Sequence, residues 1–309
     1  TNFEDGRIYR INAAGTVLST YKHSTNLITP GGAPDALDGP GFSALNQNSA
    51  QRGERVWAVQ PFKGRLYYSV WREDSGRPSA AVGNEIWSIA LDASGNFTGA
   101  SQLEFVVSGV AAVTNPVADI AFRPGCDCMI IGERSMQNDT CSSAHQSRVL
   151  EFCFNGQSWT PGSRVYNAAV GGFGIATSSA GGVDYDWTPG TKTAVWASAD
   201  AAQFSAGTFV YGMMGMPMAG SNTSLTDSLV DFDLNTTGID KFMVGSLDIS
   251  CPECVQPPAN MNLWLPLDET SGPIASNPPM AGTKNGVYVG IPNPISVPTP
   301  VDRGHCGRG

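Results

Sequence analysis

The sequence predicts an all-β protein: a β-propeller-like repeat of four-stranded blades, followed by a short C-terminal β segment. Glycine and proline are abundant, with 36 and 21 copies in 309 residues, and only 15% of the residues are charged. Short apolar runs are broken by Gly, Pro, Asn and Asp, which is typical of sandwiches, barrels and propellers. Two kinds of sequence unit also recur in alternation along the first 250 residues.

The first recurring unit is a strand-like run with bulky apolar residues at alternate positions. Its copies lie at residues 6–11, 84–89, 147–152 and 207–211. Ile8 and Ile86 are 78 positions apart, Ile86 and Val149 are 63 apart, and Val149 and Phe209 are 60 apart. Alternation of this kind predicts strands with one buried face.

The second unit is a strand, a turn with proline and glycine, and a second strand. Its copies lie at residues 57–68, 119–131 and 184–196. Pro61 and Pro124 are 63 positions apart, and Pro124 and Pro189 are 65 apart. Proline presets the first turn position and glycine permits a positive φ, so each copy is predicted to be a hairpin that turns at these residues.

Stacking of the repeats explains how each unit buries its apolar face. A period of about 60 residues fits four-stranded blades with long loops. The predicted units are an incomplete first blade at 1–54 and fuller units at 55–115, 116–179 and 180–249. Either residues 240–249 complete the first blade, or further blades precede this chain. A two-sheet sandwich is the alternative architecture.

Seven cysteines are present, and six of them are disulfide candidates: Cys126, Cys128, Cys141, Cys153, Cys251 and Cys254. Cys306 is left over. The spacing of the first four differs from that of a zinc ribbon, although metal binding stays the alternative. Cross-strand disulfides in an oxidising compartment are the favoured interpretation, with the connectivity open.

The C-terminal part divides into a Cys/Pro linker at 250–262 and a segment at 263–309. Two stretches of this part resemble the opening of a laminin-G-like (concanavalin A-like) jelly-roll domain. They are Asn262-Leu-Trp-Leu-Pro-Leu-Asp-Glu-Thr-Ser-Gly272 and, after it, Asn285-Gly-Val-Tyr-Val-Gly290. The resemblance implies the start of a jelly roll without the part that binds ligands in that family. The segment is therefore predicted to be an incomplete jelly roll or an extended arm that adds a strand to a neighbouring chain. The whole arrangement resembles large secreted bacterial surface proteins.

Two sets of oxygen-bearing residues are candidates for a site. Asp119 and Asp184 hold equivalent positions in the repeat, so they could line a central channel and bind a cation, or else satisfy nearby backbone amides. The other set is a weak calcium candidate, whose alternative is a capped turn: Asp231, Asp233, Asn235 and Asp240. Calcium is the one cofactor that the sequence suggests.

The methionines at positions 213, 214, 216 and 218 are interpreted as core residues, with a copper site as the alternative. Tryptophans at strand centres are likewise expected in the core rather than on a sugar-binding platform.

The charge balance argues against nucleic acid as a partner. The net charge is -9 and the isoelectric point is about 4.7, with 18 Lys and Arg residues spread thinly. No apolar run is long enough for a transmembrane segment.

Together these features predict a secreted or cell-surface protein, with the periplasm as the alternative location. Its expected role is structural or adhesive, as an adhesin, scaffold or assembly subunit that binds a protein partner or itself. A propeller enzyme or a binding module for extracellular carbohydrate is the alternative function, and the sequence leans away from an enzyme.

Overall fold

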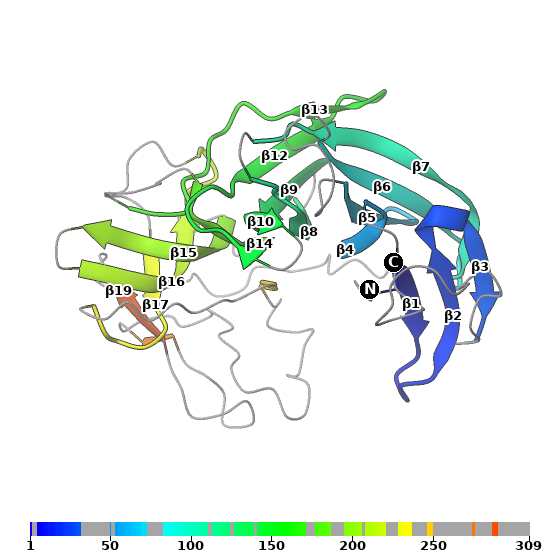
Figure 1. Cartoon of the computed structure of the whole chain (residues 1–309), viewed down its shortest axis with the longest axis horizontal. Helices are drawn as coiled ribbons and strands as arrows, with labels where there is room; N and C mark the ends of the chain where they lie inside the picture. The colour runs from blue at the N-terminus through cyan, green and yellow to red at the C-terminus, as the bar shows by residue number, and fades with distance from the viewer. Residues whose placement is uncertain are drawn as a thin grey trace, which may run out of the picture. The chain divides into compact units, whose positions relative to one another are not determined.

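The computed structural model describes the chain in fifteen stretches that fall into two compact units (Figure 1). The first unit comprises residues 1–120 and 135–143, and the second comprises residues 121–134 and the chain from 144 onward. The described residues are 1, 5–31, 50, 53–72, 83–110, 113–123, 127–138, 141–170, 177–186, 195–205, 208–220, 228–236, 246–249, 274–275 and 286–289.

The first unit contains two main antiparallel sheets, ordered β1-β2-β3 and β4-β5-β6-β7. Its strands are β1 (Arg7–Ile11), β2 (Val17–Lys22), β3 (Leu27–Pro30), β4 (Arg55–Phe62), β5 (Arg65–Trp71), β6 (Asn84–Leu91) and β7 (Phe97–Val107). A small hairpin of β10 (Met136–Asn138) and β11 (Cys141–Ser142) and a single 3-10 turn, η1 (His23–Thr25), complete this unit. The core joins the two main sheets, because Ile8 and Tyr21 pack with Val56, Tyr68 and Ile89.

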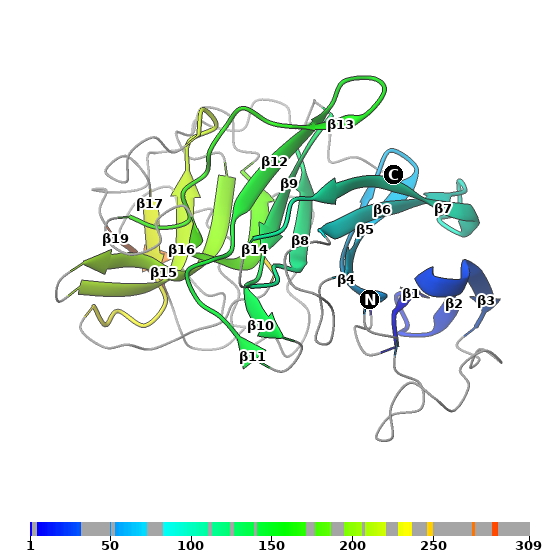
Figure 2. The ribbon, with the colours of Figure 1, turned by 45° about the horizontal axis from the view of Figure 1, so that its top comes forward.

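The second unit contains a four-stranded sheet, ordered β13-β12-β9-β8, and a larger sheet that begins β14-β15-β16-β17 (Figure 2). Their strands are β8 (Val117–Phe122), β9 (Cys128–Glu133), β12 (Val149–Phe154), β13 (Trp159–Pro161), β14 (Ser179–Tyr185), β15 (Val195–Ser205), β16 (Thr208–Met216) and β17 (Ser228–Asp231). The boundary between the units runs through β8. All pairings of these strands are antiparallel.

The all-β prediction is confirmed. The strands of the predicted hairpins correspond to β4–β5, β8–β9 and β14–β15, the first two strands of three successive sheets. The turns predicted at Pro124–Gly125 and Pro189–Gly190 lie outside the described residues. The other recurring unit corresponds to β6, β12 and β16, the third strand of each sheet, and to β1. No α-helix is present among the described residues, and none of them forms a helix long and apolar enough to cross a membrane.

The turn of the first hairpin differs from the prediction. Pro61 lies within β4, where it pairs with Leu66, and the turn is formed by Lys63 and Gly64. Both turn residues have positive φ, at 47° and 73°, as a two-residue type I′ turn requires. The turn follows the twist of the flanking strands, so proline is not needed to start it.

The larger sheet of the second unit is apolar on both faces. Val195, Ala197 and Met214 belong to a core that also contains Ile130 and Val149 of the neighbouring sheet. On the other face, Trp196 and Met213 pack with residues from β17 and with Ile249. The methionines of β16 are thus buried core residues, as predicted.

Residues 246–249 are the described part of the segment predicted to complete the first blade. They form no strand and lie in the second unit, where the Ile249 amide donates to Asp184 Oδ2 at 2.6 Å. The prediction of a strand here is therefore wrong for these four residues, because they pack across the β14–β17 sheet instead of pairing at an edge.

The C-terminal segment contributes β18 (Ile274–Ala275) and β19 (Gly286–Val289). β19 pairs antiparallel with β17 on one side and with β18 on the other, which extends the sheet to six strands. The register sets Val289 opposite Leu229 and Val287 opposite Asp231. Part of the predicted arm thus adds a strand within its own chain.

Gly132 of β9 allows a very close approach to β14. A Cβ added at Gly132 would lie 2.2 Å from the Gly181 carbonyl oxygen and 2.9 Å from Val183 Cγ1. Since backbone atoms on both sides would have to move, we expect Gly132→Ala to lower the free energy of unfolding by about 3 kcal/mol in a urea titration. Gly156→Ala is the control, because Gly156 has a positive φ of 97° but open space around it, and about 1 kcal/mol is expected there. Equal losses in the two variants would contradict the close-packing argument.

Candidate functional site

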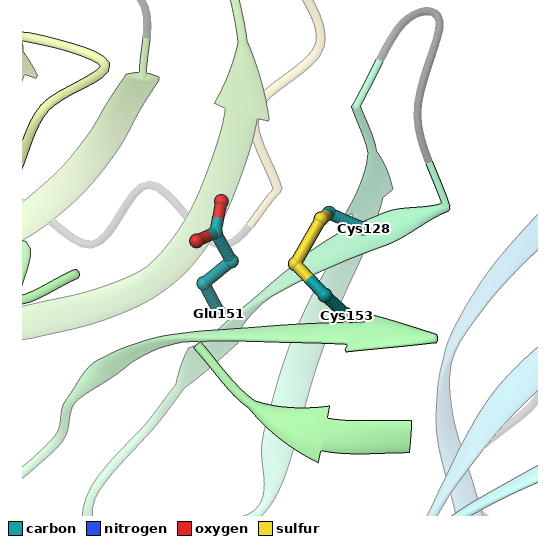
Figure 3. Close-up of side chains that lie close together, drawn as sticks. All are labelled: Cys128, Glu151 and Cys153. Carbon is teal, nitrogen blue, oxygen red and sulfur yellow. A yellow bond between two sulfur atoms is a disulfide. The ribbon is translucent and has the colours of Figure 1, made fainter. Parts of the chain in front are cut away.

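The candidate site lies on the β9–β12 pair of the second unit and is built around a disulfide between Cys128 and Cys153 (Figure 3). These cysteines are directly opposite each other in the antiparallel register, with their Cα atoms 4.0 Å apart. Glu151 lies two residues before Cys153 on the same strand. Side chains at i and i+2 share a face, so the carboxylate and the disulfide rise from the same side of the sheet.

Glu151 is a buried carboxylate with several donors around it. Its side chain is 1% exposed. Arg164 Nη1 donates to Oε1 at 2.7 Å and lies 2.8 Å from Oε2. The Tyr185 hydroxyl donates to Oε1 at 3.0 Å, and the Tyr166 hydroxyl lies 3.5 Å from the same oxygen. The positive charge and the hydroxyl groups offset the cost of burying the carboxylate.

Tyr166 keeps its proton in this environment. Burial raises the pKa of Tyr166 to about 12, and the nearby Glu151 charge acts in the same direction. The Tyr166 hydroxyl is also 3.4 Å from the Met218 carbonyl oxygen, which can accept a hydrogen bond from it. Tyr166 therefore acts at neutral pH as a donor group beside the carboxylate.

The donor atoms of Cys128, Cys153 and Glu151 all lie within 4.8 Å of one another. Two sulfurs and a carboxylate oxygen are a ligand set that suits thiophilic divalent metals once the sulfurs are thiolates. In the disulfide form the sulfurs are joined to each other. The group then acts as a cross-strand link beside a buried ion pair.

Two further buried carboxylates of the second unit are paired with arginine. Glu133 at the end of β9 accepts three hydrogen bonds from Arg148, including one from its backbone amide. Asp200 of β15 accepts from Arg134 Nη1, which lies 2.6 Å from both carboxylate oxygens. Burial raises the pKa of Asp200, and Arg134 opposes that shift. Charge pairing is thus the usual state of buried acids in this unit.

The structure brings a serine near a histidine close to Asp200. His145 Nδ1 lies 3.3 Å from Ser178 Oγ, and the Asp200 amide donates to the Ser178 carbonyl oxygen. Ser178 is fully buried at 0% exposure. Its hydroxyl is therefore not open to a substrate in this conformation, and the Asp200 carboxylate is held by Arg134, with His145 also close enough to affect its pKa.

The two proposed channel acids lie in different units. Asp119 Oδ1 accepts the amide of the next residue, Ile120, at 3.1 Å. Asp184 Oδ1 accepts from Tyr185 at 2.7 Å, and Oδ2 accepts from Ile249 at 2.6 Å. Asp184 thus ties residues 246–249 to β14, which agrees with the backbone-satisfying alternative. Whether the two acids share a channel stays a prediction.

The predicted calcium residues form a tight turn after β17. Asp231 Oδ1 accepts the amides of Asp233 and Leu234, and Asp233 Oδ1 accepts that of Asn235. Burial raises the pKa of Asp231 to about 6, and the Asp233 side chain contributes to the shift. Asp240 lies outside the described residues. The turn has the capping bonds of the alternative interpretation, and calcium binding stays a prediction.

Of the disulfide candidates, Cys128 and Cys153 form the described bond. Cys141 is exposed and carries a free thiol. Cys126, Cys251 and Cys254 lie outside the described residues. Trp71, Trp159 and Trp196 are all buried, so these three belong to the core as predicted.

Sequence analysis missed a buried polar cluster in the first unit. His23 Nδ1 is 2.9 Å from the Tyr68 hydroxyl, and its ring packs edge-on against Trp87 at 4.8 Å between centroids. Burial, followed by the charge of Arg72, lowers the pKa of His23 to about 4. A single histidine among polar residues gives no sequence signal for this cluster, because the partners of His23 come from two other strands.

Comparisons of this chain with protein-family models, with curated proteins and with solved structures found no match.

We expect Glu151→Gln to lower the free energy of unfolding by about 2 kcal/mol, because the arginine loses its buried counter-ion. The loss stays moderate since the Arg164 side chain is 29% exposed and regains water. Urea titration of Glu151→Gln, Arg164→Met and the double variant provides the measurement. The double variant should be more stable than the sum of the single losses predicts. Simple additivity would mean that the two side chains do not interact.

His23 makes the first unit sensitive to acid. The native state holds the imidazole neutral down to about pH 4, whereas the unfolded chain takes up a proton below about pH 6.5. Stability is therefore fully present above about pH 6.5 and falls as the pH drops towards 4, by about 3 kcal/mol at most. Urea midpoints followed by tryptophan fluorescence from about pH 7 to 5 should fall in the wild type.

The control for this prediction is His23→Gln, which removes the titrating group but keeps a hydrogen-bonding side chain. We expect this variant to be less stable at neutral pH and to show a flatter pH dependence than the wild type. The difference between the two proteins removes the contribution of Asp231, whose raised pKa acts in the opposite sense. Parallel pH profiles in both proteins would contradict the assignment to His23.

Proposed function

We propose that this chain is an extracellular or cell-surface structural protein that assembles by adding a strand to a sheet edge. In this proposal the successive four-stranded sheets are propeller blades, and the segment from 263 onward is a strand-donating arm with a jelly-roll-like sequence. The single observation that carries the proposal is the pairing of β19 with the outer strand β17. Strand addition of this kind gives affinity through main-chain hydrogen bonds.

Sequence distance makes exchange between copies feasible. Ile249 is bound to Asp184 of β14, and β18 begins 25 positions later at Ile274. A chain of that length can span on the order of 80 Å when extended. The same β17–β19 register could therefore form within one chain or between two copies, as in domain swapping. The proposed partner is a second copy of this chain.

The disulfide supports the proposed location. Cys128 and Cys153 are joined across neighbouring strands of the second unit, and such bonds persist mainly in oxidising compartments. The acidic balance, with a net charge of -9, is consistent with a soluble protein outside the cell.

A cysteine-pair experiment tests strand exchange directly. Val230 and Tyr288 are opposite each other in the β17–β19 register. We expect a mixture of Val230→Cys and Tyr288→Cys chains, unfolded together and refolded under mild oxidation, to give a disulfide-linked dimer on a non-reducing gel. Both chains carry Cys141→Ser, which removes the exposed thiol.

The control pairs Tyr288→Cys with Leu103→Cys, because Leu103 is an exposed residue of β7 in the other unit. No specific dimer is expected from that mixture. Light scattering of the unmodified chain over a range of concentrations gives the oligomeric state independently. A monomer at every concentration, together with no dimer from the Val230–Tyr288 mixture, would overturn the assembly proposal.

A further inference from the structure

We propose that Cys128, Cys153 and Glu151 form a latent site for a thiophilic divalent metal ion such as Zn²⁺, closed by the disulfide and opened by reduction. The inference goes beyond the proposed function, since it concerns what the second unit binds when the disulfide is broken. It rests on the geometry, charge and surroundings of these three side chains.

The geometry needs only side-chain rotation. The three donor atoms already lie within 4.8 Å of one another. A tetrahedral Zn²⁺ with bonds of about 2.3 Å to sulfur and about 2.1 Å to oxygen places its ligands roughly 3.6 Å apart. Two sulfurs separate to about that distance once their bond is cleaved. β9 and β12 remain paired by their backbone, so the ligands stay on one rigid face.

Charge balance favours the metal in this buried place. Glu151 and Arg164 already form a neutral pair at the site. Reduction gives two neutral thiols, and binding of Zn²⁺ replaces their two protons. Two thiolates offset the charge of the ion, so the net charge is zero in the disulfide, dithiol and metal-bound forms. A buried cluster that stays neutral avoids the large cost of an unpaired charge.

The surroundings of Glu151 match those of a ligating carboxylate. Metal ligands are usually held in place by hydrogen bonds from neighbouring groups. Arg164 and Tyr185 hold the Glu151 oxygens at 2.7 to 3.0 Å, and a carboxylate has about four lone-pair sites. One oxygen can therefore bind the ion while the existing hydrogen bonds remain. Arg164 and Tyr185 are positioning residues in this proposal.

The reaction balances with a named reductant. A dithiol supplies two electrons and two protons to the Cys128–Cys153 bond and becomes a disulfide. Alternatively, a phosphine supplies the two electrons and takes an oxygen atom from water to become a phosphine oxide, and the same water supplies the two protons. The two sulfurs take up two protons to become thiols. Metal binding then releases these protons to solvent and forms two metal–sulfur bonds and one metal–oxygen bond. The oxidation state of the metal does not change.

The experiment uses the full chain with the other five cysteines replaced by serine at positions 126, 141, 251, 254 and 306. The protein is reduced with a phosphine, freed of reductant without air and titrated with Co²⁺, whose bonds to thiolates give a charge-transfer band. We expect one Co²⁺ per reduced chain, none in the disulfide form, and displacement by Zn²⁺. A chain that also carries Cys128→Ser and Cys153→Ser should show no band.

Two carboxylate variants separate ligation from general stability. Glu151→Gln should weaken Co²⁺ binding at least about tenfold. Glu133→Gln is the matched control, because Glu133 of β9 is also buried and is paired with Arg148, which directly precedes β12. The Co²⁺ affinity of this variant should stay within about twofold of the parent. Equal weakening by the two variants would overturn the role of Glu151.

Circular dichroism shows whether the reduced chain is folded or unfolded before and after the metal is added. A reduced chain that refolds when Co²⁺ or Zn²⁺ is added supports the site, because metal binding is then coupled to folding. A reduced chain that binds no Co²⁺, whether folded or unfolded, overturns the proposal. This outcome leaves the strand-exchange proposal untouched, since that assembly requires no reduction.

Discussion

The register of β12 against β9 is the constraint on which the second unit depends. It sets Cys153 opposite Cys128 and turns Glu151 to the same face. Gly132 of β9 lies opposite Val149 in this register, and a Cβ added there would lie 2.2 Å from the Gly181 carbonyl oxygen of β14. Because strand side chains alternate, a slip of β12 by one residue would turn Cys153 and Glu151 to the opposite face. The disulfide and the position of the buried carboxylate are therefore consequences of one alignment.

Paired charges make that alignment specific. A buried carboxylate without a counter-ion is costly, so each alternative register that separates Glu151 from Arg164 or Glu133 from Arg148 is penalised. An apolar pair of the same volume would stabilise several registers almost equally. In the second unit, buried ion pairs therefore distinguish between strand registers that the packing of small apolar residues alone would stabilise almost equally. The first unit also contains a buried uncharged contact, since His23 Nδ1 lies 2.9 Å from the Tyr68 hydroxyl.

Local patterns explain why much of the fold could be predicted. The alternation of apolar and polar residues can be read from neighbouring positions alone, so the strands β6, β12 and β16 could be predicted from their own residues. The hairpins follow likewise, although the first one turns at Lys63–Gly64 because a positive φ at two positions matters more than a nearby proline. The sequence was enough to predict that cysteines form disulfides, but which two cysteines pair depends on which strands become neighbours.

The candidate site was less predictable because its partners are distant in the chain. Glu151 meets Arg164 across a strand and a turn, and Tyr185 comes from the next sheet. Nothing in the sequence around Glu151 distinguishes it from a surface acid of an alternating strand. The acids that did stand out, Asp184 and Asp231, owe their spacing to turns and strand ends, where carboxylates accept backbone amides. At both positions the described hydrogen bonds of the carboxylate come from backbone amides.

The edges of the sheets explain where a strand can be added. β3 and β13 are short outer strands that end in Pro30 and Pro161, and proline cannot donate to a further ladder. β7 is longer, but its pairing with β6 is interrupted by two irregularities that bend the edge. β17 contains no proline, and its pairing with β16 has no irregularity. An edge without protection must be covered to avoid uncontrolled pairing, and β19 covers it. β19, which comes from the C-terminal segment, therefore covers the edge at β17, one of several sheet edges in the described part of the chain. In the proposed assembly the same edge is covered by β19 of a second copy.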